Sequence, residues 1–103
     1  PMAAAKSAFV FVGGGVDKET AKSVIETKYL TLYVQGCKNY DEAEEAVRAL
    51  VADGCTAIEL CAGFGNEGVA RMQKAAGPDV AVGAVRFDFH PAMKFKTGDQ
   101  FFG

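Results

Sequence analysis

The chain has 103 residues; half are hydrophobic, 23% are charged, and its 11 Lys and Arg nearly balance its 13 Asp and Glu. This length and composition indicate one domain over residues 1–103 with a single core, and they lack the excess of basic residues that is typical of a nucleic-acid-binding protein. The apolar runs are far shorter than the ~20 residues of a membrane-spanning helix, so we expect no membrane partner and no secretion signal.

The three cysteines, Cys37, Cys55 and Cys61, form neither an even set nor a CxxC pair. Stable disulfides and a thiolate zinc site are therefore not expected, and reduced thiols predict a cytoplasmic protein. Pro1 precedes what resembles an initiator methionine. We therefore expect residues 1–6 to be an expression remnant or a disordered start, rather than to carry the catalytic proline of a tautomerase.

Strand-like and helical segments alternate along the whole chain, which favours a mainly parallel sheet. The expected elements in order are a strand at 7–12, a short helix at 17–25, a strand at 29–35, a helix between Asn39 and Gly54, a strand at 56–61, a helix from Asn66 to Ala76, and a strand at 80–89. Asn39 and Glu42 form the pattern of a capping box. The apolar residues of the tail at 91–103 follow no helical or strand periodicity, and the tail is expected to pack on the sheet or on a partner.

Side chains alternate across a strand, so each predicted strand divides into two faces. The apolar face holds Leu30, Leu32, Val34, Ile58, Leu60, Val85, Phe87 and Phe89. The more polar face holds Thr31, Tyr33, Gln35, Ala57, Glu59, Cys61, Ala84, Arg86, Asp88 and His90.

This asymmetry predicts that all helices cover the apolar face. The expected fold is a four-stranded, mainly parallel α/β sheet in the order 1-2-3-4, similar to half of a (β/α)8 barrel. The polar face then needs its own cover, so we expect a homo-oligomer, most simply a dimer, unless the tail supplies that cover.

Ligands of parallel α/β sheets bind beyond the carboxyl ends of the strands, where several ionisable side chains are expected here. Glu59 is the candidate base, His90 donates or shuttles a proton, and Arg86 anchors an anionic or enolate oxygen. Asp88 would orient His90 or Arg86, and Tyr33 shares their face as a candidate substrate-binding residue. The alternative is a structural Glu59–Arg86 ion pair.

Cys61 shares the face of Glu59 and is a further catalytic candidate, because a cysteine and a histidine in one cleft suffice for nucleophilic catalysis. A buried, unreactive thiol is the alternative. Glu59, Asp88 and His90 could also bind a divalent cation, but the sequence lacks closely spaced histidines. We therefore predict neither a metal nor another cofactor.

Residues 63–68 match the GxGxxG pattern between a strand and a helix, and Asp88 follows 20 residues after Gly68. This spacing is typical of dinucleotide-binding proteins. The charged Glu59 in the preceding strand and the short chain weigh against that interpretation. The backbone around Gly63, Gly65 and Asn66 could instead hold an anion or a carbonyl oxygen at the helix amino terminus, or could simply form a tight loop.

Three motifs carry a resemblance to a small, uncharacterised family of α/β proteins of about this length with no agreed function. They are the segments Ile58–Gly65, Glu67–Arg71, and Val85–Asp88 with His90-Pro91, followed by Gly98-Asp99. The resemblance covers most of the chain, although Ala62 stands where a glycine is expected. It implies an α/β fold and no particular activity.

The segment from Gly54 to Gly83 is similar to a βαβ unit of the 2-keto-3-deoxy-6-phosphogluconate aldolase barrels. That resemblance implies proton transfer by Glu59, but no convincing Schiff-base lysine is present, since Lys94 and Lys96 lie in the tail. The sequence thus predicts a cofactor-independent lyase or isomerase acting beside a carbonyl on a small carbonyl-containing or anionic substrate. The alternative is a non-catalytic module for anion binding or assembly, and a dinucleotide binder is less favoured.

Overall fold

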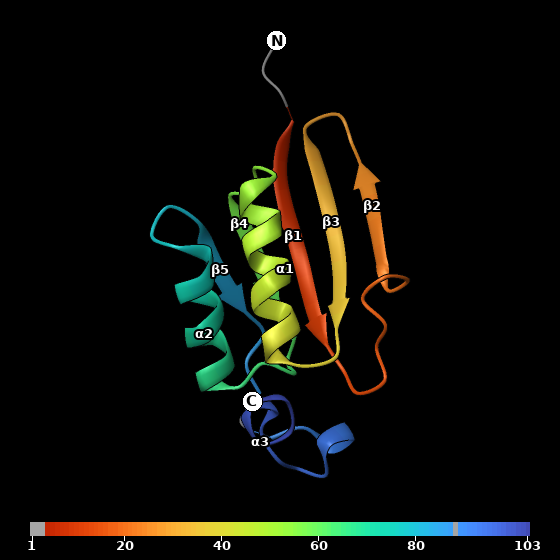
Figure 1. Ribbon diagram of the computed structural model, residues 1–103, viewed down its shortest axis with the longest axis vertical. Helices are drawn as coiled ribbons and strands as arrows, with labels where there is room; N and C mark the ends of the chain where they lie inside the picture. Colours follow the sequence, from red (N-terminus) through yellow and green to blue (C-terminus); the bar gives the residue numbers. More distant parts are fainter. Residues whose placement is uncertain (1–3, 88) are drawn as a thin grey trace.

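The computed structural model describes residues 4–87 and 89–103, so residues 1–3 and the predicted site residue Asp88 lie outside the described chain. Two long helices pack on one face of a five-stranded sheet (Figure 1). The strands are β1 (Ala5–Val12), β2 (Lys22–Glu26), β3 (Leu30–Cys37), β4 (Ala57–Leu60) and β5 (Ala81–Ala84). The helices are α1 (Tyr40–Ala52), α2 (Asn66–Ala76) and the short α3 (Gly98–Phe102), with a 3-10 turn at Pro91–Met93.

The sheet is mixed, with the strand order β2-β3-β1-β4-β5. β2 runs antiparallel to β3, and the other neighbouring pairs are parallel. The expected parallel order 1-2-3-4 is therefore wrong, because β1 lies at the centre and α1 crosses over it to connect β3 with β4. The run from Phe9 to Val12 is apolar at every position: Val10 and Val12 are buried under the helices, and Phe9 and Phe11 lie on the opposite face.

The segment at 17–25, predicted as a helix, instead contains a turn and the strand β2. The Thr27 hydroxyl donates to the Leu30 carbonyl at 2.9 Å and accepts from the Leu30 amide at 3.1 Å, which closes a β2–β3 hairpin. The β-branched Val24 and Ile25 favour the extended backbone. A helix over 17–25 is therefore wrong.

Both long helices begin and end close to the predicted residues. The Asn39 side chain accepts from the Glu42 amide at 3.0 Å, which confirms the predicted cap of α1. The Glu42 carboxylate accepts from the Lys38 amide, one residue before the position expected in a capping box. α1 ends just before Gly54, whose φ of 102° suits glycine, and α2 ends at Gly77 with φ of 84°.

The core lies between the sheet and the two long helices. Val10, Ile58 and Leu60 from the strands and Val47 and Met72 from the helices are fully or almost fully buried. No helix within residues 4–87 and 89–103 is long and apolar enough to cross a membrane.

The register shows which side chains share a face of the sheet. Ala8 lies beside both Tyr33 and Ile58, whereas Phe9 lies beside Val34 and Glu59. Tyr33 therefore belongs to the face covered by the helices. The apolar side chains of β3, namely Leu30, Leu32 and Val34, belong to the opposite face with Glu59, which corrects their predicted position beside Ile58 and Leu60.

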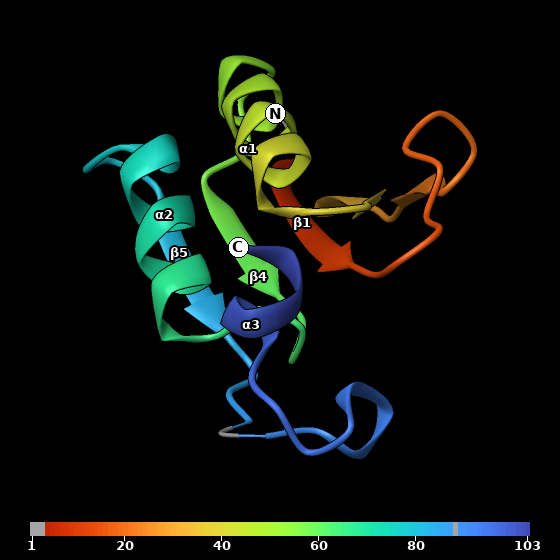
Figure 2. The ribbon, with the colours of Figure 1, turned by 60° about the horizontal axis from the view of Figure 1, so that its bottom comes forward.

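The chain after β5 leaves the sheet, so the last predicted strand is shorter than the expected range 80–89. The tail passes beyond the carboxyl ends of the strands, where α3 packs near the first turn of α2 (Figure 2). The tail therefore lies at the edge of the sheet where the sequence predicts a site.

Candidate functional site

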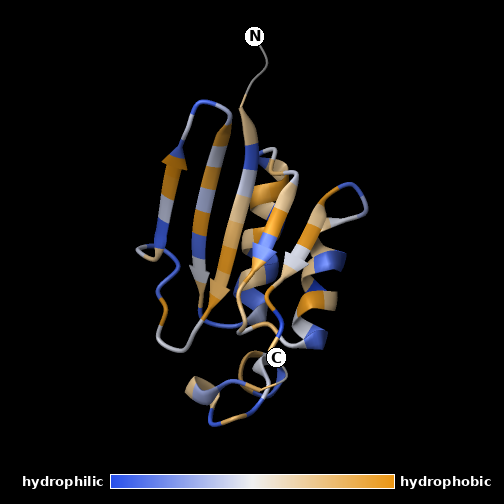
Figure 3. Cartoon of the chain, turned by 180° about the vertical axis from the view of Figure 1, so that it is seen from behind, coloured by the Kyte–Doolittle hydropathy of each residue, from blue (hydrophilic) through white to orange (hydrophobic). Residues whose placement is uncertain are grey.

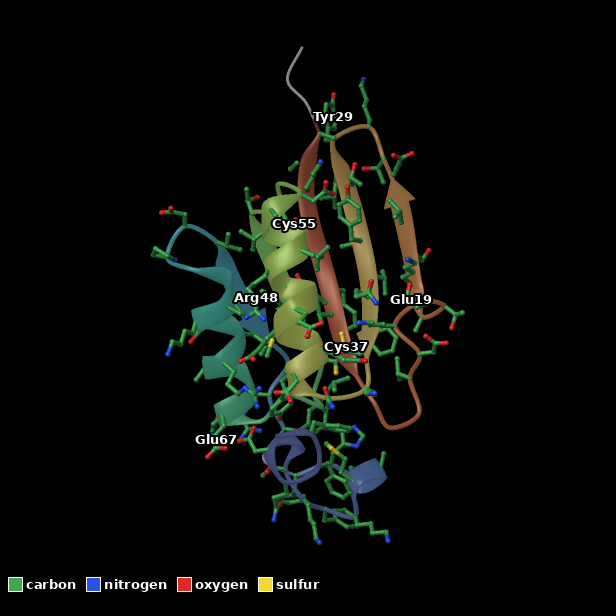
Figure 4. The ribbon with its side chains drawn as sticks, viewed as in Figure 1. Glu19, Tyr29, Cys37, Arg48, Cys55 and Glu67 are labelled. Atoms are coloured by element: carbon green, nitrogen blue, oxygen red, sulfur yellow. The ribbon has the colours of Figure 1, made fainter. Side chains whose placement is uncertain are left out.

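A carboxylate from the tail occupies the amino terminus of α2. Asp99 accepts hydrogen bonds from the amides of Glu67 and Gly68 and from the Tyr40 hydroxyl, each at 2.9 Å. Figure 4 shows Glu67 at the end of α2 that lies against the tail. We call this group of contacts the tail clamp. It satisfies helix amides that would otherwise be available to an external anion.

The pKa shifts of Asp99 and Tyr40 agree with the hydrogen bonds of the tail clamp. Burial alone would raise the pKa of Asp99, but the amides of Glu67 and Gly68 and the Tyr40 hydroxyl, helped by the charge of Arg86, lower it below its ordinary value. Burial raises the pKa of the Tyr40 hydroxyl well above its ordinary value, and Asp99 adds to this effect. Tyr40 therefore stays a protonated donor to an ionised Asp99 near neutral pH.

Close packing around the tail clamp explains the glycine pattern at 63–68. A Cβ on Gly65 would lie 2.5 Å from the Asp99 carboxylate, and one on Gly68 would lie 2.5 Å from the Tyr40 ring. A Cβ on Gly98 would collide with the carbonyl oxygen of Gly63. Gly65 and Gly98 allow the tail to approach the β4–α2 loop and Gly68 makes room for the Tyr40 ring, so their spacing does not require a dinucleotide.

A cavity of about 350 Å³ lies beside the tail clamp, at the carboxyl ends of β1 and β4. Its walls are mostly apolar side chains and glycine backbone, which suits a small organic ligand. The residues that line it are Val12, Gly13, Gly14, Cys61, Ala62, Gly63, His90, Ala92, Met93 and Phe102.

His90 is held in this cavity by its own turn. It caps the 3-10 turn, and its Nδ1 accepts from the Ala92 amide at 3.0 Å. The Phe87 ring lies 5.0 Å from the imidazole, centroid to centroid. Because Nδ1 accepts a hydrogen bond, the neutral ring carries its proton on Nε2 and can donate it to a ligand.

Cys61 is the partly exposed one of the three free cysteines. Its Sγ accepts a hydrogen bond from the Gly63 amide at 3.3 Å, which orients the sulfur. Cys37 and Cys55 are buried, and burial raises the pKa of the Cys37 thiol to about 11 and also raises that of Cys55. Figure 4 shows both of these cysteines beside α1, away from the tail.

The structure brings Cys61, Gly63 and His90 to one cavity, but it separates other predicted site residues from them. Glu59 is exposed on the face opposite the helices, and Tyr33 lies on the helix face. Neither residue lines the cavity.

Arg86 and Asn66 lie together beside the amino terminus of α2. The Arg86 Nε donates to the Asn66 side-chain oxygen at 2.7 Å, and its Nη1 donates to the Phe87 carbonyl. The predicted Glu59–Arg86 ion pair is absent from the salt bridges of the described residues. Gly65 belongs to the tail clamp, where its amide donates to the Tyr40 hydroxyl at 3.0 Å.

Sequence reasoning missed Tyr40, Asp99 and Met93 as residues of this region. Gly98-Asp99 belonged to the motifs that carried the family resemblance, and this was the available signal for Asp99. Tyr40 meets Asp99 across 59 residues of sequence, so no local pattern reveals their contact.

A second cavity of about 350 Å³ lies between the β1–β2 connection and α1. Its lining is largely charged, and Lys18 and Glu45 pair there at 3.8 Å. It lacks the combination of a partly exposed thiol and an imidazole. In the part of the chain that the structure describes, no group of three or more His, Cys, Asp or Glu residues could hold a metal ion.

The chain belongs to the family of unknown function DUF6506, whose model matches residues 5–100. No curated protein and no solved structure matches the chain. The family therefore agrees with the resemblance seen in the sequence, and it assigns no activity to the cavity.

Proposed function

We propose that this member of the DUF6506 family is a small-molecule enzyme that performs acid–base chemistry beside a carbonyl in the cavity between β1, β4 and the tail. One observation carries the proposal: the Cys61 thiol and the His90 imidazole line the same mostly apolar cavity. The Gly63 amide contacts the Cys61 Sγ and the Ala92 amide contacts the His90 Nδ1, and these contacts orient both side chains. Preorganised groups of this kind are what proton transfer requires.

The proposed reaction is an isomerisation through an enol. The Cys61 thiolate removes a proton from the carbon beside the carbonyl, and that electron pair forms a carbon–carbon double bond. The carbonyl oxygen takes the proton of His90 Nε2, so the enol is neutral. The enol oxygen then returns its proton to His90, and the thiol delivers the first proton to a different carbon or to the opposite face.

Glu59 is the alternative base, as the aldolase-type resemblance implied. Its carboxylate lies on the open face of the sheet, so it would act only on a substrate that reaches beyond the cavity. Arg86 would then serve as an anion anchor near Asn66. The two assignments differ in which side chain removes the carbon-bound proton.

Deuterium exchange tests the proposal without knowledge of the natural substrate. A panel of small keto and hydroxy acids would be incubated in D2O and followed by proton NMR. We expect exchange beside a carbonyl, reduced ~10²–10⁴-fold by Cys61→Ser and by His90→Gln. Glu59→Gln should leave the rate unchanged. Exchange that is lost in Glu59→Gln and kept in Cys61→Ser would reassign the base to Glu59.

A non-catalytic assembly module remains the second candidate, and the apolar open face of the sheet favours it. An anion-binding version has less support, because Asp99 already occupies the amino terminus of α2. Saturable ligand binding without exchange, unchanged by Cys61→Ser and His90→Gln, would favour the module over the enzyme. Both functions suit a cytoplasmic protein, in which the three free thiols stay reduced.

A further inference from the structure

The β2–β3 hairpin turns its apolar side away from the helices. On β2, Lys22 and Glu26 point to the helix side, whereas Ile25 points to the open face. On β3, Gln35 points to the helix side, whereas Leu32 points to the open face. A sheet face that meets water is normally its polar side. The apolar pattern of the hairpin is therefore typical of strands whose open face is covered by another layer.

The apolar surface continues onto the central strand. Phe9 lies beside Val34 in the register, and the Phe11 ring lies over Gly36. Figure 3 views this face directly, with the five strands in front of the helices and no other element covering them. Glu59 is the single ionisable side chain that the described strands present on this face.

The face has the size that a specific interface needs. At about 4.8 Å between strands and about 3.3 Å per residue, the five strands cover a flat footprint of roughly 450 Å². Protruding side chains expose more area than their flat projection. The flat footprint alone is thus more than half of the ~800 Å² that one partner contributes to a standard interface. Monomers rarely leave apolar patches larger than a few hundred Å² in water.

The lack of charge identifies the kind of partner. A face with one carboxylate offers no charge pattern with which to select a different protein, whereas a second copy presents the same apolar surface across a twofold axis. Two sheet faces pack about 10 Å apart with interdigitated side chains. Glu59 lies on β4, beside Phe9 in the register, and is exposed in the single copy.

We propose that the open face of the sheet, centred on Phe9, Leu32 and Val34, is the interface of a homodimer in which two copies pack sheet against sheet. This inference goes beyond the proposed enzyme, because it concerns a different surface and stands whether or not the cavity is catalytic.

Val24 and Ile25 offer a matched pair of variants. They are neighbours on β2 with similar exposures, 54% and 51%, but they point to opposite faces. Because both side chains are exposed, Val24→Lys and Ile25→Lys should both keep the fold, which far-ultraviolet circular dichroism would verify. Sedimentation of the full chain over a range of concentrations would then report its association.

We expect the wild type and Val24→Lys to sediment as dimers. Ile25→Lys should weaken dimerisation at least about tenfold, because it places an ammonium group in an apolar interface. A wild type that stays monomeric at every concentration would overturn the proposal, as would equal weakening by both variants. A monomer that binds lipid vesicles through this face would assign it to a membrane surface instead.

Discussion

The two halves of the sheet direct their apolar side chains to opposite faces. β4 and the helix-facing positions of β1 place Val10, Ile58 and Leu60 under α1 and α2, where the chain completes its own core. The β2–β3 hairpin places Ile25 and Leu32 on the open face, where the chain supplies no cover. The first half forms the core of a single copy. The second half presents the apolar face that the proposed homodimer would cover.

The largest expected loss of stability is in the half of the sheet that α1 and α2 cover. Leu60→Ala should lower the free energy of unfolding by about 3 kcal/mol at any protein concentration, because it opens a cavity in the core. Leu32→Ala should cost the dissociated monomer about 1–2 kcal/mol, since that side chain is partly exposed. Urea denaturation of dilute protein measures both values. Equal losses would contradict the difference between the two halves.

The next effect concerns the contact between the tail and the β4–α2 loop. Gly98→Ala should destabilise the fold by about 2 kcal/mol, because the added Cβ collides with the Gly63 carbonyl and displaces the tail. Gly14→Ala is the matched control, since a Cβ there would meet no atom within 4 Å. Thermal unfolding of both variants tests this. Unchanged stability of Gly98→Ala would show that the tail does not need this close approach.

A smaller effect should depend on pH. The folded-state pKa of Asp99 is lowered, so its carboxylate contributes stability above its ordinary pKa of ~4, and this stability is lost as the pH falls through the folded-state value. Asp99→Asn should cost about 1–2 kcal/mol at pH 7, and the difference from the wild type should shrink below about pH 4. Melting curves between pH 7 and pH 3 measure this change.

Asp79→Asn, on the exposed turn before β5, is the control for Asp99→Asn and should change little. A stability difference between wild type and Asp99→Asn that stays constant down to pH 3 would show that the charge of Asp99 is not what holds the tail.

The smallest effect is a difference in thiol reactivity. Iodoacetamide at pH 8 should modify Cys61 before Cys37 and Cys55, whose thiol pKa values burial raises. Peptide mass spectrometry identifies the modified residue. In Cys61→Ser the fast phase should disappear, and early modification of Cys37 would show that the helix-covered half opens readily.

The sequence predicted the helix-covered half well because local signals there agree with the tertiary structure. Asn39 and Gly54 mark the ends of α1, and Gly77 marks the end of α2. Cys61 and His90 were expected at the ends of neighbouring strands, but β5 ends at Ala84 and His90 reaches the cavity from the tail. Capping and turn residues at the helix ends therefore account for most of the elements that the sequence predicted correctly.

The hairpin half was wrong because its signals were ambiguous. Ala21, Val24 and Ile25 have helical spacing over a window too short to separate a period of 3.6 from one of 2. The apolar side of β3 was assigned to the helices because apolar residues were expected to face the chain's own core. The structure places Leu32 and Val34 on the open face instead, which the chain's own helices do not cover.

Hydroxyl-radical footprinting of the wild type, read by mass spectrometry in dilute and in concentrated solution, tests most directly whether a second copy covers the open face. The homodimer predicts that Phe9 and Leu32 become protected as the concentration rises, whereas Tyr29, 75% exposed in the β2–β3 turn, stays reactive. Oxidation of Phe9 and Leu32 that does not change with concentration would contradict the account.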